Sequence, residues 1–150
     1  MANLTSGNIS QNNIVTQPYV KVDIGGSNLE TVSGNSGWVR LASRQAIMIY
    51  VTVDAFDAAD TLDTFQIEEA KDKNGLGAVL LTGNALPVLA ADVTAGAVFV
   101  LECVGSELAT GFGFVRLNAA ATGNTGADQI SVIYIRDKAN TDLTIADARI

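Results

Sequence analysis

The sequence predicts an all-β fold, a jelly-roll-like β-sandwich of about eight antiparallel strands with polar arms at both ends. Its 150 residues suit one domain of ordinary size. Apolar residues make up 48% of the chain and charged residues only 17%, with 14 glycines, which suits strands with large buried faces. The apolar residues occur in short alternating or continuous runs between Gly-, Asn- and Asp-rich turns, and no run keeps a helical period beyond a turn or two.

The two ends of the chain are more polar than its middle. Residues 1–18 are rich in Asn, Ser, Thr and Gln, and we expect a flexible N-terminal arm followed by a single β-sandwich domain over 19–150. The arm is either a loose terminus or a segment that orders against a neighbouring subunit. Residues 137–150 are expected to form a last edge strand or a C-terminal arm. The N-terminus has no basic start and no apolar core, so we expect no signal peptide.

Three strands are predicted in the first third of the domain, over Tyr19–Ile24, Trp38–Ala42 and Gln45–Val53. The third is apolar on both faces, so it is either central in a sandwich or covered by another subunit. One of its faces carries Tyr50. Trp38 and Tyr50 could form a ligand platform, but aromatic residues at strand spacing more often belong to a core or an interface.

An acidic segment follows, with the four carboxylates Asp54, Asp57, Asp60 and Asp63 spaced three residues apart. Carboxylate oxygens are ligands for calcium, yet the alternating acids, glycine and terminal Glu of a calcium loop are missing. Aspartate is also common in turns, where its side chain accepts nearby backbone N–H groups. We therefore expect a turn here and no metal site.

The segment from Asp63 to Gly83 is predicted to be a β-hairpin. Its turn spans Lys71 to Gly75 and ends in Asn-Gly, a strong hairpin signal, and Ala78–Leu81 is the return strand. In the first strand of the hairpin, Phe65 and Ile67 are expected to face the core. The residues expected to face outward are Thr64, Gln66 and Glu68.

Strands are also predicted over Ala97–Val104, Gly111–Asn118 and Gln129–Arg136. Between the hairpin and these strands, Leu86, Val88 and Leu89 are expected to pack under the sheet, and Ala119–Ala127 is expected to be a turn region. The single cysteine, Cys103, is expected to be a buried small apolar residue, because the chain has no His and no nearby cation that would activate a thiol.

The chemistry-bearing motifs of common enzymes are missing from the sequence. There is no His, so no Ser-His-Asp or Cys-His relay, and there is no phosphate-binding loop, CxxC or HExxH. Glu68 and Glu69 are adjacent and should point to opposite faces of a strand, which makes them a poor catalytic pair. We expect no enzyme activity and no cofactor, with a carboxylate-based hydrolase as the remaining enzymatic alternative.

The charge of the chain bears on its partners. A net charge of −7 with nine scattered Lys and Arg residues argues against nucleic acid and against an anionic membrane surface. The sequence also has no apolar run long enough for a membrane helix.

The hairpin segment TFQIEEAKDKNGLGAVLLTG resembles small virion structural proteins of tailed bacteriophages. In that family, a strand ending in Q-x-x-x-A is followed by a D-x-x-G-x-G-A turn. The matching positions here are Gln66, Ala70, Asp72, Gly75, Gly77 and Ala78. The apolar strand Ala46–Val53 upstream and the segments ELATGFGFVRLNAAATG and SVIYIRD downstream extend the resemblance over roughly residues 37–137.

The resemblance implies a capsid decoration or cement protein. Such a protein is made in the host bacterial cytoplasm, binds the outer surface of the head shell and braces the major capsid protein. It implies no catalytic residues. Strands that are apolar on both faces favour self-association, as a homotrimer or homodimer. The residues expected at an interface are Trp38, Tyr50, Lys71, Lys73 and Asn74. The alternative is a β-sandwich binding module, such as a head-fibre base, a tail component or a carbohydrate- or receptor-binding tip that uses Trp38.

Overall fold

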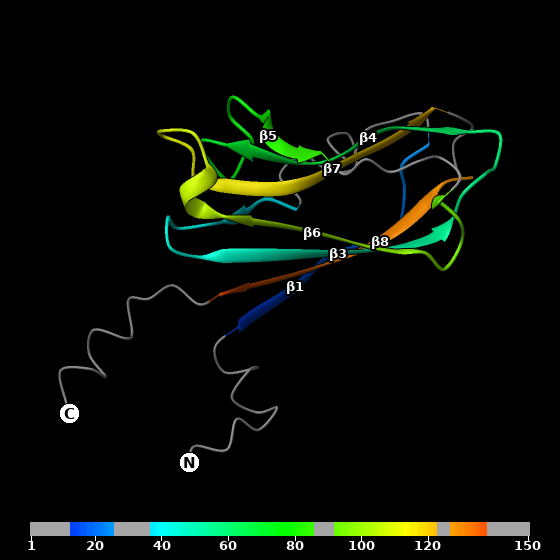
Figure 1. Ribbon diagram of the computed structural model, residues 1–150, viewed down its shortest axis with the longest axis horizontal. Helices are drawn as coiled ribbons and strands as arrows, with labels where there is room; N and C mark the ends of the chain where they lie inside the picture. The colour runs from blue at the N-terminus through cyan, green and yellow to red at the C-terminus, as the bar shows by residue number, and fades with distance from the viewer. Residues whose placement is uncertain (1–12, 26–36, 86–91, 123–126, 138–150) are drawn as a thin grey trace, which may run out of the picture.

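Two four-stranded antiparallel sheets lie face to face in a computed structural model that describes residues 13–25, 37–85, 92–122 and 127–137 (Figure 1). The predicted β-sandwich of about eight strands is therefore confirmed. The strands, in chain order, are β1 (Asn13–Asp23), β2 (Val39–Arg40), β3 (Ala46–Ala55), β4 (Thr61–Ala70), β5 (Val79–Ala85), β6 (Val98–Val104), β7 (Phe114–Thr122) and β8 (Gln129–Asp137). A 3₁₀ turn, η3 (Gly105–Glu107), follows β6.

The strand order is that of a jelly roll. One sheet has the order β1-β8-β3-β6 and the other β2-β7-β4-β5. The first strand pairs with the eighth, the second with the seventh, the third with the sixth and the fourth with the fifth, all antiparallel. These four pairs form one long hairpin that is wrapped into two sheets. The β3·β8 pair joins two of them into the first sheet, and the β4·β7 pair joins the other two into the second.

The core lies between the two sheets and is built by strand alternation. On β3, Ile47, Ile49, Val51 and Val53 are all buried, whereas the residues between them are exposed or half-buried. Phe65 and Ile67 of β4 are buried from the opposite side, as predicted. The Phe65 ring meets the edge of Phe99 from β6 at a centroid distance of 5.5 Å, which links the two sheets.

Two strand boundaries differ from the prediction. β1 begins at Asn13, so the last six residues of the expected arm, 13–18, belong to this strand, and residues 13–16 pair with β8. β7 continues to Thr122, so the predicted turn over Ala119–Ala127 is wrong in its first part. The small residues Ala119 and Ala121 are buried in the core, where their size fits opposite the larger side chains of β4.

Several expectations fall outside the described residues. These are the structure of residues 1–12, the packing of Leu86, Val88 and Leu89, and the arm over 138–150.

The β4–β5 hairpin is confirmed, but its turn is longer than predicted. Residues 71–78 separate the two strands, rather than a turn that closes at Asn74-Gly75. The Asp72 carboxylate accepts hydrogen bonds from the backbone N–H groups of Asn74 and Leu76, which organises the loop. Gly75 has φ +79°, a left-handed conformation in which L side chains are strained.

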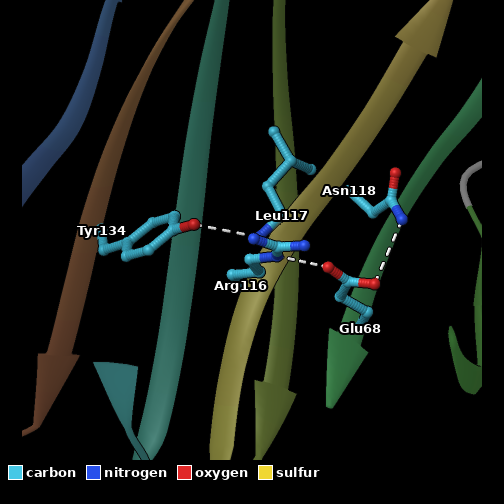
Figure 2. Close-up of polar contacts among 5 residues, drawn as sticks. All are labelled: Glu68, Arg116, Leu117, Asn118 and Tyr134. Atoms are coloured by element: carbon cyan, nitrogen blue, oxygen red, sulfur yellow. Dashed lines mark hydrogen bonds and ion pairs between the residues drawn. The ribbon is translucent and has the colours of Figure 1, made fainter. Parts of the chain in front are cut away.

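The short strand β2 leaves much of one edge of β7 without a partner strand. β2 pairs only with Phe114 and Val115, and Leu117 lies beyond it. There the hydroxyl of Tyr134, on the opposite sheet, accepts a hydrogen bond from the Leu117 N–H at 2.9 Å (Figure 2). Further along, the Ala121 N–H donates to the carbonyl of Ile24, just past β1. Side chain and backbone from the other sheet thus replace the missing strand.

Candidate functional site

The outer face of the β1-β8-β3-β6 sheet carries an exposed apolar surface. Nine large apolar side chains of the described residues are exposed, and six of them lie on this sheet and point away from the core. We define the apolar face as these six residues with Met48, Tyr50 and Ile135 beside them. The six are Val15, Val20, Val98, Val100, Val104 and Ile133.

Cross-strand pairing makes this face continuous. Met48 lies between Ile135 on one side and Glu102 on the other, and the next outward row places Tyr50 between Ile133 and Val100. With strands about 4.8 Å apart and about 3.3 Å per residue, four strands and seven residues span roughly 15 by 20 Å. Apolar patches of a few hundred Å² on a protein surface commonly mark interaction sites.

A recess of about 450 Å³ opens at one end of the apolar face, where β3 begins and β6 and β8 end. Met48, Val104 and Ile135 line it together with three acidic residues. These acidic residues are Glu102, Glu107 and Asp137.

The structure places one predicted interface residue, Tyr50, in the middle of this face. Trp38 lies elsewhere, half-buried, with the guanidinium of Arg116 over its ring at 4.5 Å from the centroid. A side chain at Gly75 would come within 2.9 Å of the Trp38 indole nitrogen. Trp38 is therefore packed between Arg116 and the hairpin loop, which leaves it poorly placed as a sugar-stacking platform.

The other three predicted interface residues lie in the β4–β5 loop. Lys71, Lys73 and Asn74 are all exposed, and the Lys71 ammonium sits 5.5 Å from the centroid of the Phe112 ring. They form a group with Trp38 at the tip of the hairpin, whereas Tyr50 is on the outer face of the other sheet. The five candidates therefore do not form one site.

Glu68 lies on the face of β4 that was predicted to point outward, but it is buried there. It shares a face of β4 with Gln66 but is only 2% exposed. Its carboxylate pairs with the guanidinium of Arg116 and accepts a hydrogen bond from the Asn118 side-chain nitrogen at 3.1 Å (Figure 2). The neighbouring Glu69 accepts a hydrogen bond from the Ala109 N–H instead. A buried carboxylate needs such partners, because burial without them is costly.

The four aspartates of the acidic segment do not gather into one site. Asp54 accepts a hydrogen bond from the Ser131 hydroxyl, and Asp63 accepts one from the Thr122 hydroxyl.

The Asp57 N–H donates a hydrogen bond to the carboxylate of Asp128, which is completely buried. Burial raises the pKa of Asp128, and the Asp60 carboxylate nearby raises it further. No group of three or more acidic or Cys residues in the described ranges is arranged to hold a metal ion.

Cys103 is buried on β6, as expected. Burial raises its pKa to about 12, with smaller contributions from Glu107 and Glu69. Its thiol is therefore protonated near neutral pH and is a poor nucleophile.

Sequence reasoning recognised part of the apolar face and missed its extent. The outward apolar residues of β3 and the alternation in β8 were visible in the sequence, but which strands lie beside them was not. The missed signal was in β6, where exposed Val98, Val100 and Val104 alternate with residues that are buried or partly buried. When both faces of a strand are apolar, one face packs in the core, and the face that points away from the core needs a partner of its own.

Comparisons of the chain with protein-family models, with curated proteins and with solved structures found no match. Within the described residues there is no helix long and apolar enough to cross a membrane.

Proposed function

We propose that this chain is a non-enzymatic structural protein of a bacteriophage virion, of the capsid decoration or cement type. It docks through the apolar face onto the outside of the head shell and braces contacts between major capsid subunits. The observation that carries the proposal is the exposed apolar face, since such a surface on a sheet calls for a partner. The sequence resemblance and the jelly-roll order, common in viral capsid proteins and also in lectins, support it.

The size of the apolar face suits a repeating partner. Its area, on the order of 300 Å², is below the roughly 800 Å² per partner of a stable two-protein interface. One copy alone therefore binds weakly. Copies that self-associate into a dimer or trimer bind a lattice of equivalent sites together, and their affinities multiply through effective concentration. The net charge of −7 keeps the free protein soluble and steers it toward a basic partner surface.

The test is co-sedimentation of the purified protein with phage heads that lack it. Such heads come from a phage whose genome has lost the coding sequence of this protein. We expect the purified protein to bind such heads saturably. Val100→Asp places a charge in the apolar face and should lower head binding at least tenfold. Val79→Asp, the matched control on β5 of the other sheet, should bind like the unchanged protein, since both valines are exposed. Absence of binding by the unchanged protein, or equal loss in both variants, contradicts the proposal.

Self-association is tested separately by light scattering at several protein concentrations. We expect the mass of a dimer or trimer at the highest concentrations. The mass of a single chain at every concentration contradicts the oligomeric part of the proposal.

The carboxylate-hydrolase alternative has a direct test at the recess. Glu102, Glu107 and Asp137 are the acids that such an enzyme would use, because they line one recess. We expect no hydrolysis of nitrophenyl glycosides. Hydrolysis that disappears in Glu102→Gln would show that the protein is an enzyme.

A further inference from the structure

The recess at the end of the apolar face has a composition that selects its occupant. Its apolar residues Met48, Val104 and Ile135 face outward on three neighbouring strands. The acidic residues Glu102, Glu107 and Asp137 also line the recess. A recess of about 450 Å³ has the size of a small-ligand or side-chain site.

Two of the three acidic residues of the recess accept hydrogen bonds from backbone N–H groups. Asp137 accepts a hydrogen bond from the Ala46 N–H at 3.2 Å, and Glu107 accepts one from the Val104 N–H at 2.7 Å. Each bond uses one carboxylate oxygen. Glu102 is exposed. Within the described part of the chain, no Lys or Arg forms an ion pair with any of these three acidic residues, so their negative charge has no ion-pair partner there.

We propose that the recess receives a lysine or arginine side chain of the docking partner. The aliphatic part of such a side chain packs on the apolar residues, and its cationic end meets the carboxylates. The inference rests on the proposed function for the identity of the partner, a subunit of the head shell. The exposed valines around the recess then contact the apolar surface that surrounds the basic residue on the shell.

This arrangement separates two tasks within one surface. The apolar face supplies area, which favours any apolar partner. The charged recess supplies selectivity, because a partner with an acidic or uncharged residue at that point leaves the carboxylates unpaired at the interface. The recess thereby fixes where on the shell the protein binds.

The chain offers a specific reporter for the recess. It has two methionines, Met1 and Met48; Met48 lines the recess, and Met1 lies outside the described residues. Protein labelled with ¹³C at the methionine methyl groups therefore shows two signals in NMR. The probes are acetyl-Leu-Lys-Leu-amide and the same peptide with norleucine in place of lysine, which keeps the aliphatic chain and removes the charge.

We expect the lysine peptide to shift the Met48 signal saturably. The norleucine peptide should bind at least fivefold more weakly. Glu102→Gln should weaken the lysine peptide several-fold, and Glu102 makes no hydrogen bond in the described residues that its replacement would break. Asp92→Asn, an exposed residue outside the recess, makes the same change in net charge and should leave the affinity unchanged. Equal binding of both peptides, or no shift of Met48, overturns the inference.

Head co-sedimentation of the same variants separates this inference from the proposed function. Binding to heads that is unaffected by Glu102→Gln, with no Met48 response to the lysine peptide, overturns the inference and leaves the decoration role standing. A Met48 response that depends on Glu102, in a protein that fails to bind heads, supports the cation-accepting recess and contradicts the decoration role. Weakening of both by Glu102→Gln supports both.

Discussion

The hydroxyl of Tyr134 is predicted to stabilise the fold by completing the unpaired edge of β7. The Tyr134→Phe substitution removes one oxygen atom and keeps the ring that packs in the core. The Leu117 N–H would then lose its acceptor, because β2 ends before it reaches Leu117. Burial raises the pKa of Tyr134 above its ordinary value, so the hydroxyl keeps its proton throughout the pH range of ordinary measurements.

The expected cost follows from the surroundings of the bond. Both residues are completely buried, so no solvent takes the place of the hydroxyl without rearrangement. A buried donor left without an acceptor costs about 1–3 kcal/mol. We therefore expect the free energy of unfolding to fall by that amount in Tyr134→Phe.

Equilibrium unfolding in urea measures the loss. The midpoint should fall while the slope of the free energy against urea concentration stays the same, because the surface exposed on unfolding does not change. Tyr50→Phe is the matched control. Its hydroxyl has no hydrogen bond in the described residues, so we expect a change within about 0.5 kcal/mol.

Amide hydrogen exchange adds a local readout. The Leu117 amide should exchange faster in Tyr134→Phe by more than the loss of global stability explains. A free energy of unfolding within about 0.5 kcal/mol of the unchanged protein, with normal protection at Leu117, would refute the reasoning.

Three further predictions follow from buried groups. The raised pKa of Asp128 means that the folded state binds its proton more tightly than the unfolded chain, so stability falls as pH rises from about 4 through the folded pKa. Asp128→Asn should therefore leave the melting temperature unchanged at pH 3 and raise it at pH 7; an effect independent of pH would contradict this. Arg116→Met leaves the Glu68 carboxylate buried without its cation and should cost about 3–5 kcal/mol in urea unfolding, most of it recovered when Glu68→Leu is added; no recovery in the double variant would argue against the ion pair. The Cys103 thiol should resist iodoacetamide at pH 8 in the native protein and react fully in urea, and rapid native labelling would show that the site opens.

The strand pattern was readable from the sequence because burial in a sheet repeats every second residue. The alternation of Ile47, Ile49 and Val51 predicted a strand with a core face, and the structure has it as β3. The Asp-Lys-Asn-Gly loop likewise marked the β4–β5 hairpin. Small residues were the weak point: the Ala119–Thr122 segment looks like a turn from composition alone, and it is a strand because the core opposite it leaves room only for small side chains.

The position of Glu68 could not have been predicted from its own strand. An acidic residue at an outward position normally reaches solvent, and only a cation on the neighbouring strand makes its burial favourable. Arg116 is 48 residues away in the sequence, and the β4·β7 register places the two side by side.

The sequence by itself determined the local structure: the strands, the hairpin, the missing catalytic motifs and the excess of negative charge. These follow from the spacing and chemistry of residues that are neighbours in the chain. The tertiary structure alone decided which faces remain exposed and which acidic residues line the same recess. The apolar face combines residues of β1, β3, β6 and β8, which lie far apart in the chain. Only the wrapping of the long hairpin into two sheets brings them together, because pairing between distant strands depends on the whole set of contacts rather than on any local pattern.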